Sequence, residues 1–242
     1  MSLKTEIYTV KAHKEKINII NKKRVRQPVT PSKGRVVGYF PSVKSNKPVA
    51  WESQMELKAC RIFEYCPTVH SYREQPEIVH YKFNGVGRKY IPDFELMLIN
   101  NEQVFIEIKP KRVLDKSEEK GRFVAISKHL NKKGIAFAVM TEEELNTGDI
   151  QDNIKLIHPY AAQDVNVDIE KYYKELCSKN EMTIGDFIQL GLTLKTIYSS
   201  IAQGLLKIDL NKKISHQSSV MINKETDHEN SIFSCRFAPD FK

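Results

Sequence analysis

The sequence predicts an α/β protein, a mixed sheet flanked by helices, with a small α+β domain near its C-terminus. Apolar residues at intervals of three and four predict helices at about residues 52–65 and 115–131. Short apolar runs between and after these helices predict buried strands. The order helix, strands, helix, strand is typical of an α/β core, which we place at about residues 35–150, inside a domain spanning 35–160.

The first half of the core begins with a short strand and a long helix. Residues 35–40 read as a strand, and the turn Ser45-Asn46-Lys47-Pro48 follows it. The helix at 52–65 carries an apolar stripe that includes Met55, Ala59 and Ile62, and Pro67 ends it. We expect Trp51 to begin this helix and to anchor the core.

The rest of the core reads as strands joined by turns, then a helix and a last strand. Asn84-Gly85 and Asn100-Asn101 have turn chemistry, and Gly134 lies just beyond the second helix as a terminator. Thr141, followed by three glutamates, predicts a capped helix start. The expected strands are residues 69–73, 77–83, 94–99, 104–108 and 135–140.

Residues 161–222 predict a small domain with a winged-helix-like pattern. Helices are expected at 168–178, 183–190 and 193–203, and strands at 205–210 and 219–222. The last helix is largely apolar, with Lys195 among its few basic residues, so docking to a protein is as well supported as binding to DNA. Residues 223–242 lack periodicity and predict a loosely ordered tail.

Positive charge is concentrated in the first fifty residues. They hold twelve Lys or Arg against Glu6 and Glu15, a net charge of +10 in a chain whose total is +8. A basic arm, residues 1–34, ahead of a near-neutral body predicts contact with a polyanion such as nucleic acid. A solvated tail that keeps the protein soluble is the alternative.

The remaining bulk properties exclude several classes. No run approaches the roughly 18 apolar residues of a membrane span, and the N-terminus lacks the apolar region of a secretion signal. The four cysteines, Cys60, Cys66, Cys177 and Cys235, form no CxxC pair. This spacing argues against a zinc ribbon or disulfide framework and favours a reduced, cytoplasmic compartment.

Two carboxylates and a lysine are placed to meet at the ends of neighbouring strands. Asp93 lies at the start of the apolar strand of residues 94–99, and Glu107 and Lys109 lie at the end of the next. Because side chains alternate along a strand, Glu107 and Lys109 project to the same face. A hairpin folded at Asn100-Asn101 would bring Asp93 roughly opposite Glu107 or Lys109.

This cluster suits hydrolysis of a phosphodiester. Two carboxylates and the backbone carbonyl of Ile108 make a hard oxygen site for one or two Mg²⁺ ions, with Mn²⁺ as a substitute. Such a metal polarises the scissile phosphate and lowers the pKa of a bound water. Lys109 would orient or deprotonate that water and offset the charge that develops on phosphorus. Alone, the pattern also fits a surface salt bridge on an edge strand.

Pro92-Asp93 followed by Glu107-Ile108-Lys109 resembles the PD-(D/E)XK nuclease superfamily, in which an acidic residue on an upstream helix completes the metal site. Two further stretches, Trp-Glu-Ser-Gln-Met-Glu at 51–56 and Ser-Tyr-Arg-Glu-Gln-Pro at 71–76, are similar to the TnsA family. TnsA is the endonuclease subunit of a heteromeric cut-and-paste transposase. The resemblance covers about residues 35–145.

The resemblance implies a restriction-endonuclease-like core and a role for each residue. Glu56, in the pattern Ser-x-x-Glu, matches the helical acidic ligand, and Asp93 matches the central metal ligand. Glu107 matches a position held by Gln or Glu in relatives, and Lys109 matches the lysine. Glu52, one helical turn from Glu56, is an alternative helical ligand, but the motif match favours Glu56.

The family implies an activity and partners. The expected activity is Mg²⁺-dependent cleavage of DNA at the 5′ ends of a transposon, in the bacterial cytosol. A TnsB-like transposase subunit would process the 3′ ends, and a TnsC-like ATPase regulator would contact the C-terminal part. The alternatives are a restriction-type or junction-resolving nuclease of the same superfamily, and a non-catalytic DNA-binding adaptor.

Basic residues around the site and in the arm are candidates for DNA contact. Solvated surface roles fit Arg73, Arg88 and Lys89 equally well. We expect His70, His80 and His158 to be ordinary strand histidines, since none has a partner at metal-ligand spacing. The full set of candidate DNA-binding residues is Arg73, Arg88, Lys89, Lys22, Lys23, Arg24 and Arg26.

Overall fold

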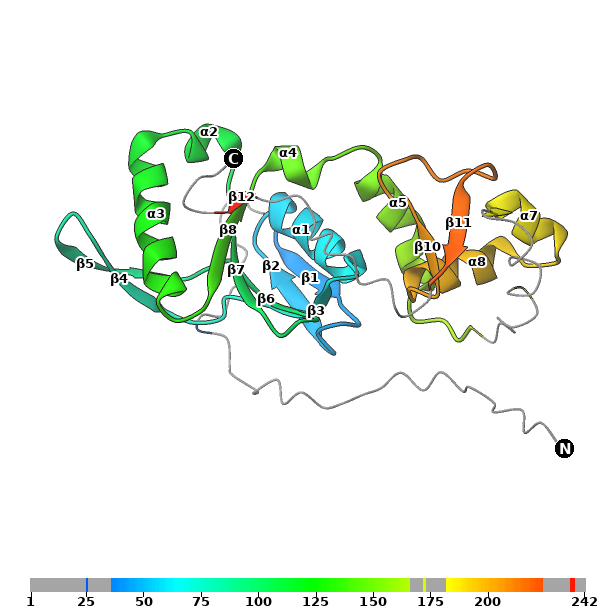
Figure 1. Ribbon diagram of the computed structural model, residues 1–242, viewed down its shortest axis with the longest axis horizontal. Coiled ribbons are helices and arrows are strands. Elements are labelled where there is room, and N and C mark those ends of the chain that lie inside the picture. Colours follow the sequence, from blue (N-terminus) through cyan, green and yellow to red (C-terminus); the bar gives the residue numbers. More distant parts are fainter. Residues whose placement is uncertain (1–24, 26–35, 166–171, 173–181, 224–235, 238–242) are drawn as a thin grey trace, which may run out of the picture.

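The computed structural model describes residues 25, 36–165, 172, 182–223 and 236–237. Its elements form a long molecule, with the sheet and its helices at one end and the C-terminal elements at the other (Figure 1). In chain order the elements are β1 (Gly38–Pro41), β2 (Pro48–Trp51), α1 (Gln54–Tyr65), β3 (Val69–Glu74), β4 (Val79–Phe83), β5 (Val86–Tyr90), β6 (Phe94–Leu98), β7 (Gln103–Ile108), α2 (Lys111–Leu114), α3 (Ser117–Asn131), β8 (Ala136–Met140), α4 (Glu142–Leu145), α5 (Ile150–Ile157), the 3₁₀ helix η1 (His158–Tyr160), β9 (Met182–Thr183), α7 (Ile184–Gln189), α8 (Leu194–Ala202), β10 (Leu206–Ile208), β11 (Ser219–Ile222) and β12 (Arg236–Phe237).

A five-stranded mixed sheet forms the centre of the α/β part. The strand order is β12-β8-β7-β6-β3, and only β7 and β8 run parallel. A parallel pair needs a crossover connection, which α2 and α3 supply between β7 and β8. The predicted mixed sheet flanked by helices is therefore confirmed.

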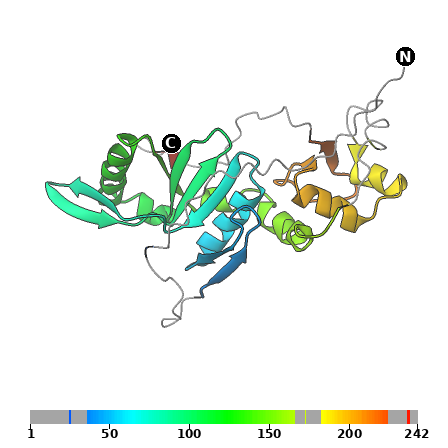
Figure 2. The ribbon, with the colours of Figure 1, turned by 90° about the horizontal axis from the view of Figure 1, so that it is seen from below.

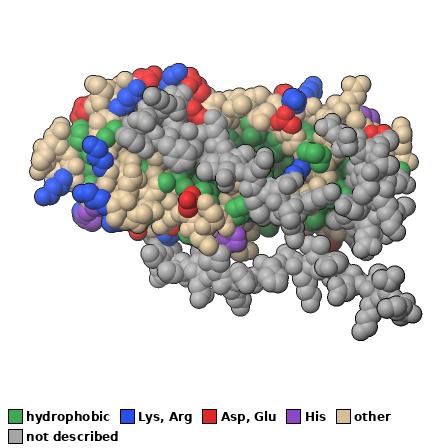
Figure 3. Space-filling model, in the orientation of Figure 1, with side chains coloured by type: hydrophobic (Ala, Val, Ile, Leu, Met, Phe, Trp, Pro, Cys, Tyr) green, Lys and Arg blue, Asp and Glu red, His purple; other side chains and the backbone are tan. Residues whose placement is uncertain are grey.

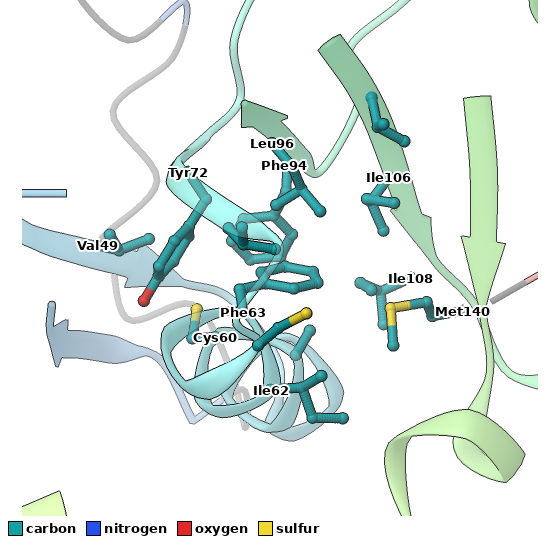
Figure 4. Close-up of a cluster of buried hydrophobic side chains, with 14 of the residues drawn as sticks. Val49, Cys60, Ile62, Phe63, Tyr72, Phe94, Leu96, Ile106, Ile108 and Met140 are labelled. Carbon is teal, nitrogen blue, oxygen red and sulfur yellow. The ribbon is translucent and has the colours of Figure 1, made fainter. Parts of the chain in front are cut away.

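Helix α1 covers one face of this sheet. Its buried side, including Phe63 and Ile62, packs on apolar residues of β3, β6, β7 and β8, and the β1–β2 hairpin lies beside it. Figure 4 shows the ring of Phe63 among Phe94, Ile106 and Ile108. Alternation along β7 places Ile106 and Ile108 in this core and leaves Glu107 to the other face, as the sequence predicts.

Helix α3 and the hairpin β4–β5 cover the opposite face. Phe105 of β7 and Phe137 of β8 pack there against Phe123 of α3 and Tyr81 of the hairpin. The hairpin turns at Asn84 and Gly85, both with positive φ, and its strands pair from Val79 opposite Tyr90 to Phe83 opposite Val86. Figure 2 shows it projecting from the sheet, so part of it lies clear of the core.

The C-terminal elements form a third core around Phe187, Ile197 and Val220. Helices α7 and α8 pack on a three-stranded antiparallel sheet in the order β10-β11-β9. The helices predicted at 183–190 and 193–203 and both predicted strands are present within one or two residues. Thr183 caps α7 and Thr193 caps α8.

Several elements differ from the sequence prediction. Trp51 ends β2, a strand the sequence did not predict, because β2 pairs with β1 and Trp51 fills space against Gly38. The helix predicted at 115–131 is present as α3, which begins at Ser117, and a short helix that was not predicted, α2, precedes it and ends at Leu114. Helix α5 also was not predicted. In the expected tail, residues 236–237 form β12, which pairs with β8 and closes that edge of the sheet.

Some predictions lie outside the described residues. They are the basic arm of residues 1–34 apart from Val25, the helix at 168–178 apart from Tyr172, and most of the tail. Cys177 and Cys235 also lie outside, whereas Cys60 and Cys66 are buried free thiols, as expected. None of the described helices combines the length and the hydropathy that a bilayer crossing requires.

Candidate active site at the ends of β6 and β7

Asp93 and Glu107 are brought together by the β6–β7 hairpin. Phe94 pairs with Ile106 across the two strands, so Asp93, one residue earlier, lies beside Glu107. The Asp93 carboxylate accepts a hydrogen bond of 2.8 Å from the backbone N–H of Ile108. This bond fixes the aspartate against the end of β7, and the predicted convergence of the two carboxylates is confirmed.

Glu107 is held by two donors. Its side chain is almost fully buried, at 4% exposure, and one carboxylate oxygen lies 2.8 Å from Lys109 Nζ. The other oxygen accepts a short hydrogen bond from the hydroxyl of Tyr90. A buried carboxylate is costly unless its oxygens are paired, so this pairing explains how Glu107 is tolerated inside the sheet.

Tyr90 was not among the residues singled out from the sequence. It ends β5 and reaches Glu107 because the β4–β5 hairpin folds back onto the sheet. The available clue was its position three residues before Asp93, at the base of a hairpin with an Asn84-Gly85 turn. The contact itself depends on how hairpin and sheet pack together, which local pattern does not show.

The carboxylates repel one another. Burial, followed by the nearby charge of Glu107, raises the pKa of Asp93 well above its usual range. Burial likewise raises the pKa of Glu56. Burial alone would lower the pKa of Lys109, but Glu107 and Asp93 outweigh it and raise that pKa. The charged forms of Asp93 and Glu56 are therefore costly, and Lys109 is held charged beside them.

Glu56 lies within electrostatic reach of Asp93 and Lys109, but its carboxylate is engaged at the start of α1. It accepts hydrogen bonds from the backbone N–H of Glu52 at 2.8 Å and from the hydroxyl of Ser53 at 2.9 Å. Ser53 in turn caps the helix by accepting from the N–H of Glu56. The Ser-x-x-Glu pattern is thus used locally as a helix cap. Glu52 lies against Gln75, whose amide nitrogen is 3.4 Å away.

The donor chemistry of the site suits a hard divalent cation. Carboxylate oxygens are what Mg²⁺ and Mn²⁺ prefer, and the mutual repulsion of Asp93, Glu107 and Glu56 would be relieved by such an ion. Within the described residues, no three Asp, Glu, His or Cys side chains are grouped closely enough to form a ready metal site. Lys109 and Ser53 hold oxygens of Glu107 and Glu56, so an ion bound by these residues would have to replace both partners.

The other predicted residues are more dispersed. Arg73 pairs with Glu95 on the neighbouring strand. Arg88 and Lys89 are exposed on β5, with Lys89 directly before Tyr90. His158 stacks on Phe40, consistent with a structural histidine. Lys22, Lys23, Arg24 and Arg26 lie outside the described residues.

The fold and the site define an α/β protein with an acidic and lysine-bearing cluster at one end of a mixed sheet. Residues 66–142, from β3 to the start of α4, match the family model described as TnsA-like endonuclease N terminal. This segment of the chain is similar to TnsA-like endonuclease domains, as the sequence resemblance implied. It includes Asp93, Glu107 and Lys109 and leaves α1, with Glu56, just outside. No curated protein matches the chain.

Proposed function

We propose that this protein is the DNA-cleaving subunit of a cut-and-paste transposase, hydrolysing a phosphodiester at the 5′ ends of the element. The observation that carries the proposal is the placement of Asp93 beside the ion pair of Glu107 and Lys109, inside the segment that matches the TnsA-like endonucleases. The same family match supports DNA as substrate. A nuclease acting in restriction or junction resolution would share the residues, but the match favours transposition.

Each residue has a separate task in this proposal. Asp93, Glu107 and Glu56 would hold Mg²⁺, with the carbonyl of Ile108 as a further ligand. The ion supplies a Lewis acid for the phosphate and a more acidic water. Tyr90 and Lys109 orient the Glu107 carboxylate, and the Ile108 N–H orients Asp93. Lys109, at 32% exposure, can also reach a phosphate and offset the charge of the transition state.

The C-terminal part is proposed to be a winged-helix domain, residues 161–222, that docks a partner protein. Helix α8 carries a single basic residue, the exposed Lys195, and much of its surface is apolar or hydroxylic. A helix that reads DNA normally presents several basic and amide side chains to the groove. We therefore assign α8 and the adjoining sheet to contact with a TnsB-like subunit or a TnsC-like ATPase.

The decisive experiment compares Asp93→Asn with Glu102→Gln. Asp93→Asn keeps the shape of the side chain but removes the charge, whereas Glu102 is an exposed acid in the turn of the same hairpin. With the transposase partner, DNA carrying the element's ends and Mg²⁺ or Mn²⁺, Asp93→Asn should lower the nicking rate more than about 100-fold. That loss exceeds the roughly 10–100-fold cost of removing a group that only positions a ligand.

Glu102→Gln should cut at the normal rate, and both variants should melt within a few degrees of wild type. Normal cutting by Asp93→Asn would remove the site assignment. Binding of Mn²⁺ to wild type but not to Asp93→Asn, measured by calorimetry, would support the metal ligands independently of activity.

A further inference from the structure

A strongly basic groove lies between the hairpin β4–β5 and helix α3. Its volume is about 650 Å³, and ten residues line it. Five of these are lysine or arginine, two are histidine, and no carboxylate is among them: the cationic residues are Lys82, Arg88, Lys89, Lys128 and Lys132. Figure 3 shows Lys, Arg and His side chains gathered at this end of the molecule, where Figure 1 places the hairpin and α3.

The cations of the groove lack acidic partners within the part of the chain that the structure describes. All five are exposed, and none takes part in a described ion pair. Elsewhere on the core, Arg73, Lys111 and Arg122 each pair with a glutamate. Gathering like charges without counter-charges costs free energy, which a bound polyanion would recover.

The groove itself shows the effect of this positive field. His129 lies within it, and burial followed by the charges of Lys133, Lys132 and His80 lowers the pKa of His129. Arg88 lies over the ring of Phe83, with 5.5 Å between its guanidinium carbon and the ring centroid. This stacking leaves the edge of the guanidinium free to donate hydrogen bonds to an anion.

Both walls of the groove begin at residues of the active site. Lys89 directly precedes Tyr90, whose hydroxyl binds Glu107. On the other wall, Arg122 of α3 is close enough to influence both Tyr90 and Lys109 electrostatically. Positions 122, 125, 129 and 132 share one side of α3, so this side runs from the site to the groove over about 15 Å.

We propose that this groove binds the phosphate backbone of the DNA duplex beside the cleaved bond. One DNA strand advances about 3.4 Å per phosphate, so a surface of roughly 15 Å spans on the order of four phosphates. Contacts of lysine and arginine with phosphate carry no sequence information and set the position of the duplex. The groove thus holds flanking DNA in place while Asp93, Glu107 and Lys109 act on the scissile phosphate. This inference rests on the proposed function.

The test compares Lys128→Gln/Lys132→Gln with Lys116→Gln/Lys120→Gln in the full chain. All four lysines are exposed on or next to α3, but Lys116 and Lys120 lie on the side away from the groove. Binding of a labelled duplex is measured by fluorescence anisotropy over a salt series without divalent metal. At 0.1 M salt the groove variant should bind the duplex at least about tenfold more weakly than wild type. The slope of the logarithm of its affinity against the logarithm of the salt concentration should be smaller by about 2. The control should bind as wild type does.

An equal loss of DNA affinity in both double variants would overturn the proposal, since it would show only a general attraction of DNA to a basic surface. Unchanged binding by the groove variant, with a normal melting temperature, would overturn it too. Tighter binding of duplex RNA than of DNA in the same groove would reject DNA as the occupant. Asp93→Asn should retain full DNA affinity in this assay. Failure of the groove proposal can therefore be distinguished from failure of the proposed nuclease site.

Discussion

At the scale of single residues, Glu107 shows how a carboxylate is kept inside a sheet. It lies between Lys109, on its own strand end, and Tyr90, from a hairpin distant in the sequence. Lys109 balances the charge, whereas Tyr90 fixes the direction of one oxygen. Burial keeps the Tyr90 hydroxyl protonated, because it raises the pKa of that group well above its usual value. Tyr90 is therefore a permanent donor in this contact at any physiological pH.

Tyr90→Phe should weaken binding of Mg²⁺ or Mn²⁺ about 10–100-fold, because Glu107 loses a group that orients it. The readout is the metal concentration that gives half-maximal nicking, with nicking at saturating metal less affected. Tyr81→Phe is the matched control: Tyr81 is buried in the same core and on the same hairpin, but does not contact Glu107. An identical metal requirement in wild type and Tyr90→Phe would exclude this positioning role.

At the scale of elements, the β1–β2 loop is bound to the end of α1. Lys44 Nζ donates to the carbonyl oxygens of Phe63 at 3.1 Å and Cys66 at 2.5 Å, which are orphan acceptors at the helix C-terminus. Glu64 accepts from the N–H groups of Val43 and Lys44. The loop and the helix thus satisfy each other's polar groups, and α1 is held where it carries Glu56 toward the site.

Stability should rise with pH between about 8 and 10 because of Lys44. Burial lowers its pKa from 10.5 to about 8, so in this window the unfolded chain binds the proton that the folded chain has released. The neutral amine still donates to both carbonyls. Burial also raises the pKa of the Cys60 thiol, and ionisation of that thiol in the unfolded chain opposes the gain in the same window, so the gain is measured as the difference in urea unfolding between wild type and Lys44→Met. This difference should grow by about 2 kcal/mol, smaller than the full shift implies because the Lys44 side chain is not wholly buried.

Lys44→Met should remove this rise, whereas Lys47→Met, at an exposed lysine three residues on, should retain it. The unfolding measurements should not extend beyond about pH 10. Burial raises the pKa of Tyr65 and Tyr72, and their ionisation in the unfolded chain opposes the gain at higher pH. Identical pH profiles for wild type and Lys44→Met would contradict the assignment.

At the scale of the whole molecule, α5 joins the nuclease core to the C-terminal elements. It packs on α1 at one side and on α8 at the other. The buried Asn153 donates from its amide to the carbonyls of Leu210 and Lys212, at 2.8 and 2.7 Å, and accepts from the N–H of Ile214 at 3.1 Å. Gly148, just before α5, leaves no room for a side chain against Asn211. Helix α5 therefore connects α1 to the C-terminal elements through direct packing on both sides.

Asn153→Ala should destabilise the fold by about 2 kcal/mol, because it leaves part-buried backbone groups of the 210–214 segment without their partner. Hydrogen exchange in β10 and β11 should accelerate more than exchange in β7 and β8, since the lost bonds hold the loop between β10 and β11. Asp152→Ala, at the exposed neighbour that pairs with Lys155, should have little effect. Equal protection of β10 and β11 in wild type and Asn153→Ala would show that α5 does not hold these elements together.

Local pattern in the sequence was sufficient for most elements and for the central chemistry. Apolar runs and turn residues predicted β6, β7 and their hairpin, and strand alternation then placed Glu107 and Lys109 on one face beside Asp93. The capped start at Thr141 was also predicted, because caps involve residues three positions apart. Ser53 caps α1 through the same spacing, although we expected that helix to begin at Trp51. These features depend on neighbours in the chain, which the sequence displays directly.

Tertiary structure alone decided the contacts between distant segments. Packing brings together the segments that form four of these features. They are the hydrogen bond from Tyr90 to Glu107, the basic groove between the hairpin and α3, the pairing of β12 with β8, and the hydrogen bonds of Asn153 with the 209–214 loop. The sequence by itself determined that Asp93, Glu107 and Lys109 meet, because a hairpin and a two-residue alternation suffice. What surrounds them was decided by how hairpin, helices and sheet bury their apolar faces against one another.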